Sequence, residues 1–267
     1  VYFRRDFRLN RPVKSAVLYA CGIGYQAMYV NGERLGRAKL DPAHTDYTRE
    51  CQYVLYTGVE ELLRAGENRF DAMLGNGWYK GRFGFEAKQR HGLFGDRYSF
   101  LCEVRVTLES GRELCFGTDG SWKWAPSPVL ESSIYDGEVY DARLAIPGWN
   151  RDPQEPAGFR PVSRGELSYA MLSDRFSVPV RVTETLPAPQ LIRTPKGENV
   201  LDFRQEITGW VRFACSLPAG TRVHLQYGEI LQDDCFYNDN LRSAKAEYTY
   251  ISDGSPAEAR PFFTFYG

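Results

Sequence analysis

Three glycines alternate with an amide and two large aromatic side chains in one short stretch of the sequence, the glycine-aromatic loop Gly75–Gly81. Glycine lets the backbone turn through positive φ or pass close to a ligand, and Trp and Tyr offer flat apolar faces with one polar group each. Such a loop can bind a sugar, with Trp78 and Tyr79 stacking on the ring and the Asn76 amide bonding a hydroxyl. The same composition is typical of a tightly packed corner of a β-sandwich, and composition alone favours that second interpretation.

A second stretch brings three carboxylates and an arginine within eight residues: Asp136, Glu138, Asp141 and Arg143. Glycosidases hold two carboxyls about 5–9.5 Å apart across the scissile bond. If this stretch is extended, however, Glu138 and Asp141 fall on opposite faces, because side chains alternate along a strand. We therefore expect a structural polar cluster, in which a carboxylate pairs with Arg143 or accepts backbone N–H groups, and no catalytic residue in this chain.

Oxygen donors gather between residues 233 and 240, but without the D-x-D-x-D-G spacing of a calcium loop, so an ordinary polar hairpin tip is the preferred interpretation. The six cysteines show no paired C-x-x-C spacing, which argues against zinc and favours reduced thiols. The sequence requires no cofactor. Calcium remains a candidate ligand, with its ligand residues unknown.

The charges nearly cancel, with 33 basic against 34 acidic side chains, and no basic stripe stands out. Nucleic acid and anionic membranes are therefore excluded as expected partners. No apolar run approaches the roughly 20 residues that span a bilayer. No signal peptide is in view, so the localisation stays open between cytoplasm and periplasm.

The elements that must position these residues are strands. Runs of alternating apolar and polar residues are separated by turn signals, among them Asn31-Gly32 and Ser110-Gly111, each of which predicts a hairpin. No amphipathic helix longer than about ten residues is expected. A proline-punctuated segment, 175–189, separates two such all-β regions. We predict an all-β fold of two tandem antiparallel, jelly-roll-like β-sandwiches, with domains 1–177 and 178–267.

Short motifs follow one another in a set order along both regions. The first region carries Gly24-Tyr25, Tyr29-Val30-Asn31-Gly32, Leu40-Asp41-Pro42, Thr45-Asp46-Tyr47, Leu63-Arg64-Ala65-Gly66-Glu67-Asn68, the glycine-aromatic loop and Gly137-Glu138-Val139-Tyr140-Asp141-Ala142-Arg143. The second carries Val200-Leu201-Asp202-Phe203, Thr208-Gly209-Trp210, Pro218-Ala219-Gly220-Thr221, Tyr227-Gly228-Glu229-Ile230-Leu231 and Asn240-Leu241-Arg242-Ser243-Ala244-Lys245. In this order, the motifs resemble the N-terminal portion of bacterial α-L-rhamnosidases of glycoside hydrolase family 78. One departure is Arg204-Gln205-Glu206, where the family usually has Gly-Gln-Asn.

In the family, the chain continues beyond the equivalent of Gly267 into an (α/α)6 barrel that holds the catalytic acid and base. The resemblance therefore implies a non-catalytic N-terminal fragment of an enzyme that releases terminal L-rhamnose with inversion, and we expect the fragment alone to hydrolyse nothing. It implies a brace for the parent's own catalytic barrel, a candidate homodimer contact, and a candidate rhamnose site, because some relatives bind rhamnose through calcium. The alternative is a free-standing calcium-dependent carbohydrate-binding or lectin-like module.

Overall fold

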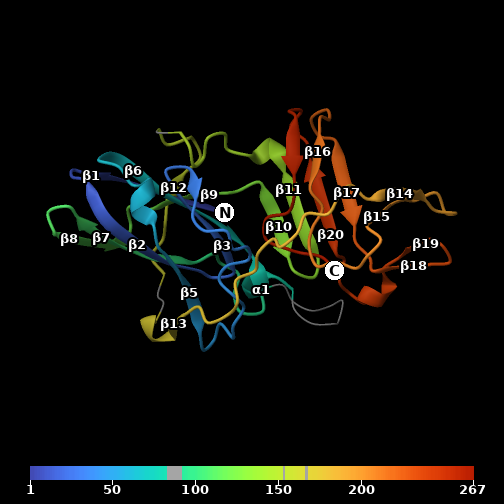
Figure 1. Cartoon of the computed structure of the whole chain (residues 1–267), viewed down its shortest axis with the longest axis horizontal. Coiled ribbons are helices and arrows are strands. Elements are labelled where there is room, and N and C mark those ends of the chain that lie inside the picture. Colours follow the sequence, from blue (N-terminus) through green and yellow to red (C-terminus); the bar gives the residue numbers. More distant parts are fainter. Residues whose placement is uncertain (83–91, 153, 166–167) are drawn as a thin grey trace.

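A computed structural model describes residues 1–82, 92–152, 154–165 and 168–267. The described chain is almost entirely β-structure, arranged in two lobes along the long axis (Figure 1). Nearly all strand pairs are antiparallel, and the two parallel pairs are β13–β5 and β11–β20. The predicted fold class of tandem antiparallel β-sandwiches is confirmed.

The first sandwich consists of a six-stranded and a five-stranded sheet. The six-stranded sheet has the order β12 (Arg160–Pro161), β9 (Lys123–Ala125), β1 (Tyr2–Leu9), β6 (Gly66–Gly75), β3 (Tyr25–Val30) and β4 (Glu33–Arg34). The five-stranded sheet has the order β13 (Leu172–Asp174), β5 (Cys51–Tyr56), β2 (Val13–Gly22), β7 (Phe100–Leu108) and β8 (Glu113–Gly117). The predicted hairpins at Asn31-Gly32 and Ser110-Gly111 are confirmed as the β3–β4 and β7–β8 turns.

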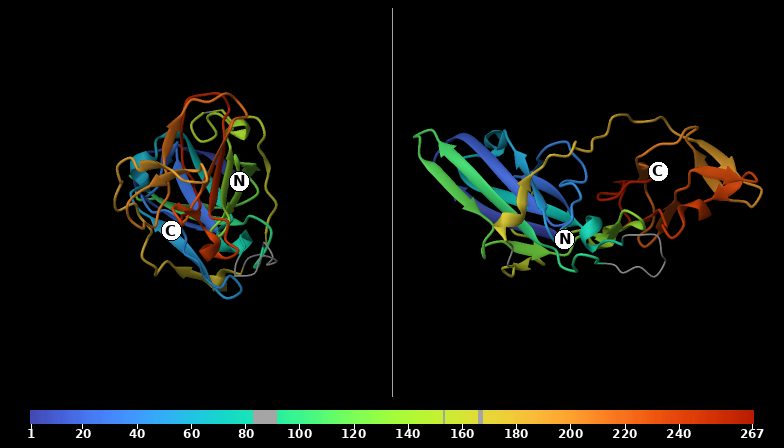
Figure 2. Two further views of the ribbon diagram at one scale, coloured as in Figure 1. Left: turned by 90° about the vertical axis from the view of Figure 1, so that its right-hand side faces the viewer. Right: turned by 90° about the horizontal axis from the view of Figure 1, so that it is seen from below.

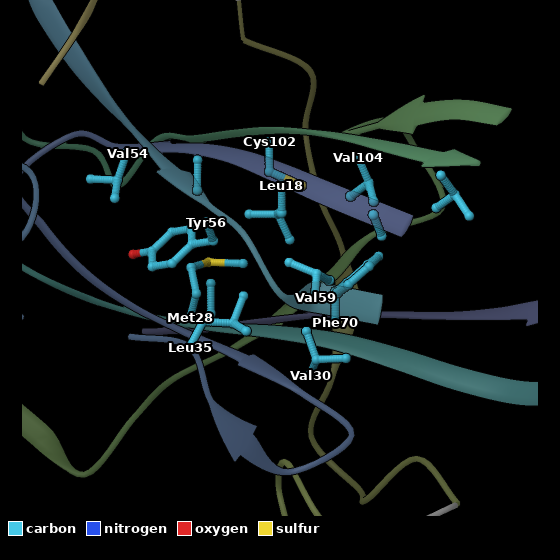
Figure 3. Close-up of a cluster of buried hydrophobic side chains, with 14 of the residues drawn as sticks. Leu18, Met28, Val30, Leu35, Val54, Tyr56, Val59, Phe70, Cys102 and Val104 are labelled. Carbon is cyan, nitrogen blue, oxygen red and sulfur yellow. The ribbon is translucent and has the colours of Figure 1, made fainter. Parts of the chain in front are cut away.

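The core of this sandwich lies between the two sheets. Leu18 and Val104 from one sheet meet Met28 and Phe70 from the other, and all four are fully buried (Figure 3). Each such side chain stabilises the fold by about 1.5–3 kcal/mol relative to an exposed one. This packing explains the alternation in the sequence, because every second residue of these strands faces the opposite sheet.

The second lobe is built around a four-stranded sheet that draws on both ends of the chain. Its order is β10 (Val129–Ser133), β11 (Gly137–Asp141), β20 (Glu247–Ile251) and β17 (Arg222–Gln226). Three two-stranded sheets accompany it: β14 (Gln190–Arg193) with β15 (Asn199–Asp202), β16 (Phe213–Cys215) with β21 (Ala257–Ala259), and β18 (Ile230–Gln232) with β19 (Cys235–Tyr237). A smaller core around Tyr248 and Tyr250 packs beneath the four-stranded sheet.

The segment 175–189, which lies between β13 and β14, runs as a long extended connection from one lobe to the other (Figure 2). The domain boundary near residue 178 stays a prediction. What the structure adds is that β10 and β11 precede this segment in the sequence, yet belong to the sheet of the second lobe, where β11 pairs with β20. The two lobes are therefore joined by backbone hydrogen bonds as well as by the connection.

Helical structure is confined to single turns in the described part of the chain. These are α1 (Gly77–Lys80) and the 3₁₀ turns η1 (Val59–Leu62), η2 (Ala142–Leu144), η3 (Tyr169–Met171) and η4 (Asp239–Leu241). Among the described residues, no helix has both the length and the apolar character needed to cross a membrane.

Candidate functional site

The glycine-aromatic loop leaves the end of β6 and forms α1 at the junction of the two lobes (Figure 1). Its glycines are required by close packing. A Cβ at Gly75 would lie 2.3 Å from the Phe263 ring, and one at Gly77 would lie 2.9 Å from the Gly24 backbone. Gly77 also has a φ of +52°, in the region that favours glycine. These positions explain the glycine spacing without a ligand.

Asn76 is buried and its side chain is hydrogen-bonded at both ends. Its Nδ2 donates to Glu131 Oε1 at 3.2 Å, and the Tyr98 hydroxyl donates to its Oδ1 at 2.6 Å. Its backbone N–H donates to Ser132 Oγ at 2.9 Å. A sugar hydroxyl reaching this amide would have to compete with partners from β10 and from the segment before β7.

We predict that Asn76→Ala lowers the free energy of unfolding by about 1–3 kcal/mol, because the Tyr98 hydroxyl loses its acceptor inside the protein. Tyr98→Phe removes the same bond from the other side and serves as the matched control. Urea denaturation of both single variants and the double variant should give a coupling energy of about 0.5–1.5 kcal/mol. Strictly additive effects would show that the bond contributes nothing to folding.

The two aromatic side chains of the loop are half-buried against other rings. Trp78 lies edge-on to Tyr135, with ring centroids 5.4 Å apart, and 5.6 Å from the His44 ring. Tyr79 meets Tyr47 edge-on at 5.4 Å. Burial lowers the pKa of His44, so this imidazole is held towards its neutral form. Trp78 and Tyr79 are both partly exposed, and the exposed part of an aromatic ring is an apolar surface suited to the apolar face of a sugar ring.

Asp136 forms a buried ion pair with Arg82, a residue that the sequence patterns did not single out. Arg82 Nε and Nη2 donate to the two carboxylate oxygens at 3.1 and 2.7 Å, and Nη1 donates to Ser243 Oγ at 2.9 Å. Since Ser243 belongs to the second lobe, this guanidinium ties the loop to both the turn at 136 and the far sandwich. Its position directly after the glycine-aromatic loop was the only sequence signal for it.

Glu138 is fully buried on β11 and binds backbone of the last segment of the chain. Its carboxylate accepts the N–H of Phe262 at 2.9 and 3.0 Å and the N–H of Phe263 at 2.9 Å. Burial raises the pKa of Glu138 to about 7, and the hydrogen bonds from Phe263 and Phe262 oppose that rise. A carboxyl enclosed in this way cannot contact a substrate.

Asp141 stands apart from Glu138 and pairs with its near neighbour. Arg143 donates to its two oxygens at 2.9 and 2.7 Å, and these hydrogen bonds lower the pKa of Asp141. The four residues singled out in this stretch therefore make three separate interactions. Asp136 pairs with Arg82, Glu138 binds the 262–263 backbone, and Asp141 pairs with Arg143. None of these contacts brings Glu138 and Asp141 to a common site.

No metal site is evident in the described ranges, where no group of three or more His, Cys, Asp or Glu side chains is arranged to hold an ion. Asp233 and Asp234 form the tip of the β18–β19 hairpin with positive φ at both positions, as a two-residue hairpin turn requires. All six cysteines lie in the described part of the chain and carry free thiols.

A cavity of about 630 Å³ lies in the second lobe. Its walls come from residues 198–207, 209–211, 224–231 and 236 and from the last two residues of the chain. None of these residues belongs to the glycine-aromatic loop. This cavity is thus separate from the loop that the sequence singled out.

The fold and the candidate site define an all-β protein of two sandwiches. Its two candidate catalytic carboxylates, Glu138 and Asp141, are already bound to groups within the protein. Residues 11–184 match the family model of the alpha-L-rhamnosidase N-terminal domain, and residues 192–267 match that of the bacterial alpha-L-rhamnosidase concanavalin-like domain. The chain belongs to the alpha-L-rhamnosidase N-terminal domain family, which confirms the resemblance inferred from the sequence.

Known relatives show the same relationship. The chain is 33% identical over 268 residues to an alpha-L-rhamnosidase from Streptomyces avermitilis, covering 99% of this chain and 26% of that protein. The crystal structure of the Streptomyces avermitilis alpha-L-rhamnosidase complexed with L-rhamnose superposes on the whole chain with a TM-score of 0.89, at 33% identity and over 26% of its own length. The native alpha-L-rhamnosidase from Aspergillus terreus superposes with a TM-score of 0.91 at 30% identity, covering 100% of this chain and 31% of its own length. The chain thus spans between a quarter and a third of the length of these relatives.

Proposed function

We propose that this chain is the non-catalytic N-terminal part of an α-L-rhamnosidase, and that its sandwiches brace the catalytic domain of an enzyme acting on terminal α-L-rhamnosides. The observation that carries the proposal is the succession of two rhamnosidase domain models along one chain that spans only 26–31% of its relatives. The burial of Glu138 and the pairing of Asp141 support a non-catalytic role for this part.

The test is hydrolysis of an aryl α-L-rhamnoside by the polypeptide that the whole gene encodes and, separately, by the 267-residue chain. We expect turnover by the first and none by the second. Turnover by the 267-residue chain that disappears in Glu138→Gln would overturn the non-catalytic assignment. A whole gene product without activity on rhamnosides would overturn the enzyme assignment and leave a free-standing carbohydrate-binding module as the alternative.

A second role, rhamnose binding, is favoured by the half-exposed Trp78 and Tyr79 at the junction of the lobes, and a calcium requirement is a separate part of this proposal that the titration below tests. Stacking on an aromatic face gives a sugar both contact area and orientation. Because Asn76 already has two side-chain partners, the aromatic side chains would contribute most of the binding and the amide would adjust on contact.

We predict saturable heat when L-rhamnose is titrated into the 267-residue chain with calcium, and loss of that heat in excess chelator. Trp78→Ala should weaken binding at least about 10-fold, since stacking of this kind contributes on the order of 1.5 kcal/mol. Tyr169→Ala, at an aromatic side chain that is 73% exposed and outside the loop, is the matched control and should change nothing. Absence of heat in both buffers would leave bracing as the sole role.

A further inference from the structure

Three cationic side chains that are distant in the sequence gather where the two lobes meet. Arg34 lies on β4, Lys39 lies in the loop that follows β4, and Arg260 follows β21 in the second lobe. All three are partly exposed. The Lys39 N–H donates to the Val180 carbonyl of the connection between the lobes at 2.8 Å, and Arg34 Nη2 donates to the Ala38 carbonyl at 2.7 Å. We call these three side chains the cationic patch.

The members of the patch influence one another electrostatically. The pKa of Lys39 is lowered to about 8, first by burial and then by the positive charges of Arg34 and Arg260. Burial raises the pKa of Tyr29, and the same two guanidinium groups oppose that rise. Tyr29 lies directly opposite Arg34 in the β3–β4 pair, and its hydroxyl has no hydrogen-bond partner among the described residues. Three positive charges and one phenol O–H therefore share a small region.

The charges of the patch lack counter-charges, unlike those of other arginines with little exposure. Such arginines elsewhere pair with an aspartate: Arg69 with Asp71, Arg82 with Asp136 and Arg175 with Asp41. Within the described ranges, no carboxylate forms an ion pair with Arg34, Lys39 or Arg260. Arg34 Nε is also buried without an acceptor. A buried donor without a partner costs free energy, which an entering acceptor would offset.

Two carboxyls near the patch are already bound to other groups. Arg34 lowers the pKa of Asp41 against the larger effect of burial, but Asp41 forms its ion pair with Arg175 at 2.5 Å. Arg260 lowers the pKa of Glu138 in the same way, but the Glu138 side chain accepts two backbone N–H groups. Neither carboxyl can neutralise the patch without giving up these bonds.

The side chains of the patch are suited to an oxyanion. A guanidinium offers a planar fork of N–H donors, an ammonium offers a point charge, and a phenol adds an O–H donor. Partial burial strengthens such contacts because the effective dielectric constant is lower than in water. Binding of a nucleic acid rests on many phosphate contacts, whereas three cations match a single anionic group. Beside the charges, the Tyr29 ring meets Trp149 edge-on at 5.3 Å, and both rings are partly exposed.

We propose that Arg34, Lys39 and Arg260, together with the Tyr29 hydroxyl, bind a single carboxylate, sulfate or phosphate group at the junction of the lobes. The site goes beyond the proposed function, because neither bracing a catalytic domain nor binding neutral rhamnose requires a charged ligand. It also shares no residue with the glycine-aromatic loop.

The test is calorimetric titration at low ionic strength of the 267-residue chain and of the polypeptide that the whole gene encodes. The ligands are sodium sulfate, sodium phosphate and D-glucuronate, with neutral D-glucose as the control. We expect saturable binding of at least one anion by both proteins, weakened by added sodium chloride, and none of D-glucose. Binding of glucuronate alone would identify a carboxylate-bearing sugar as the ligand, and binding of sulfate or phosphate alone an inorganic anion.

Two results of the titration would overturn the proposal. One is the absence of heat with all three anions. The other is binding by the 267-residue chain that is lost in the longer polypeptide, because the patch would then contact another part of that polypeptide.

Two lysines give a matched pair of variants. Lys39→Gln removes a charge from the patch and should weaken binding of the anion at least about 10-fold. Lys14→Gln removes the same charge from an exposed position on β2 and should change the affinity by less than about 2-fold. Lys39→Arg keeps the charge and should restore most of the affinity. Equal weakening by the two glutamine variants would show that net charge alone attracts the anion, and the site would be wrong.

Discussion

Gly137→Ala is expected to lower the free energy of unfolding by about 3–5 kcal/mol, because the new methyl group has no space and the backbone no freedom. Gly137 begins β11 with a φ of +96°, and a Cβ there would lie 1.8 Å from the Glu247 carbonyl oxygen and 2.7 Å from its carbonyl carbon. Both atoms are backbone of β20, so the clash is relieved only by separating the strands that join the two lobes. Urea denaturation followed by tryptophan fluorescence measures the loss.

The matched control is Gly111→Ala in the β7–β8 turn. Gly111 has a comparable φ of +81°, but beyond its chain neighbours no atom lies within 4 Å of the place that a methyl group would take. Only the backbone strain of about 1–2 kcal/mol should therefore be lost. If the two variants proved equally stable, the close parallel pairing of β11 with β20 at Gly137 would be wrong.

Glu138→Ala should lower the free energy of unfolding by about 3–5 kcal/mol at pH 5. The substitution leaves the buried N–H groups of Phe262 and Phe263 without an acceptor, at about 1–3 kcal/mol each. Glu138→Gln keeps one acceptor oxygen of the same size and should lose less than half as much. At pH 5 the raised pKa keeps Glu138 protonated, and a larger loss in Gln than in Ala would contradict the assignment of its side-chain oxygens as acceptors for these two groups.

The same residue predicts a pH dependence of stability. Because burial raises the pKa of Glu138 from its usual 4.5 to about 7, the folded protein holds this proton more tightly than the unfolded chain does. Its contribution is therefore complete below about pH 4.5 and is lost as the pH rises through about 7, by up to about 3 kcal/mol. Burial also raises the pKa of Asp71 to about 7, against the opposing effect of Arg69, so wild type should lose stability over the same interval from both groups.

Urea denaturation between pH 4.5 and 8 separates the two carboxyls. Glu138→Gln should lose less stability than wild type as the pH rises, and the difference between the two slopes belongs to Glu138. The slope that remains combines Asp71 with other groups that titrate in this range, among them the Val1 amino group and His44, whose pKa values burial lowers. Parallel curves for wild type and Glu138→Gln would show that Glu138 does not titrate in this range. The comparison does not depend on the absolute stability of either protein.

Local patterns in the sequence were sufficient for the strands and turns. Asn31-Gly32 was predicted as a hairpin because both positions tolerate positive φ, and the structure has φ values of 50° and 90° there. Ser110-Gly111 is the second predicted hairpin turn, and it joins β7 to β8. Both predictions depend only on residues adjacent in the chain, which is why they needed no knowledge of the partners.

The role of the candidate site residues could not be predicted in the same way. Extended geometry placed Glu138 and Asp141 on opposite faces, but it did not indicate that Glu138 meets backbone more than a hundred residues away. Nor did it indicate that Asp136 pairs with Arg82 and, through it, with Ser243. These partners are set by which strands lie side by side, and periodicity within a strand carries no information about that.

By itself, the sequence determined an all-β chain of two sandwiches, the turns that connect its strands and, through the order of its motifs, its resemblance to the rhamnosidase family. Strand periodicity and turn chemistry are properties of neighbouring residues, so they can be read without a fold. Only the tertiary structure decided that β11 pairs with β20 across the lobes and that Asn76 and Glu138 are buried among hydrogen-bond partners. Burial and pairing depend on residues brought together from distant parts of the chain, and they exist only once the strands have packed.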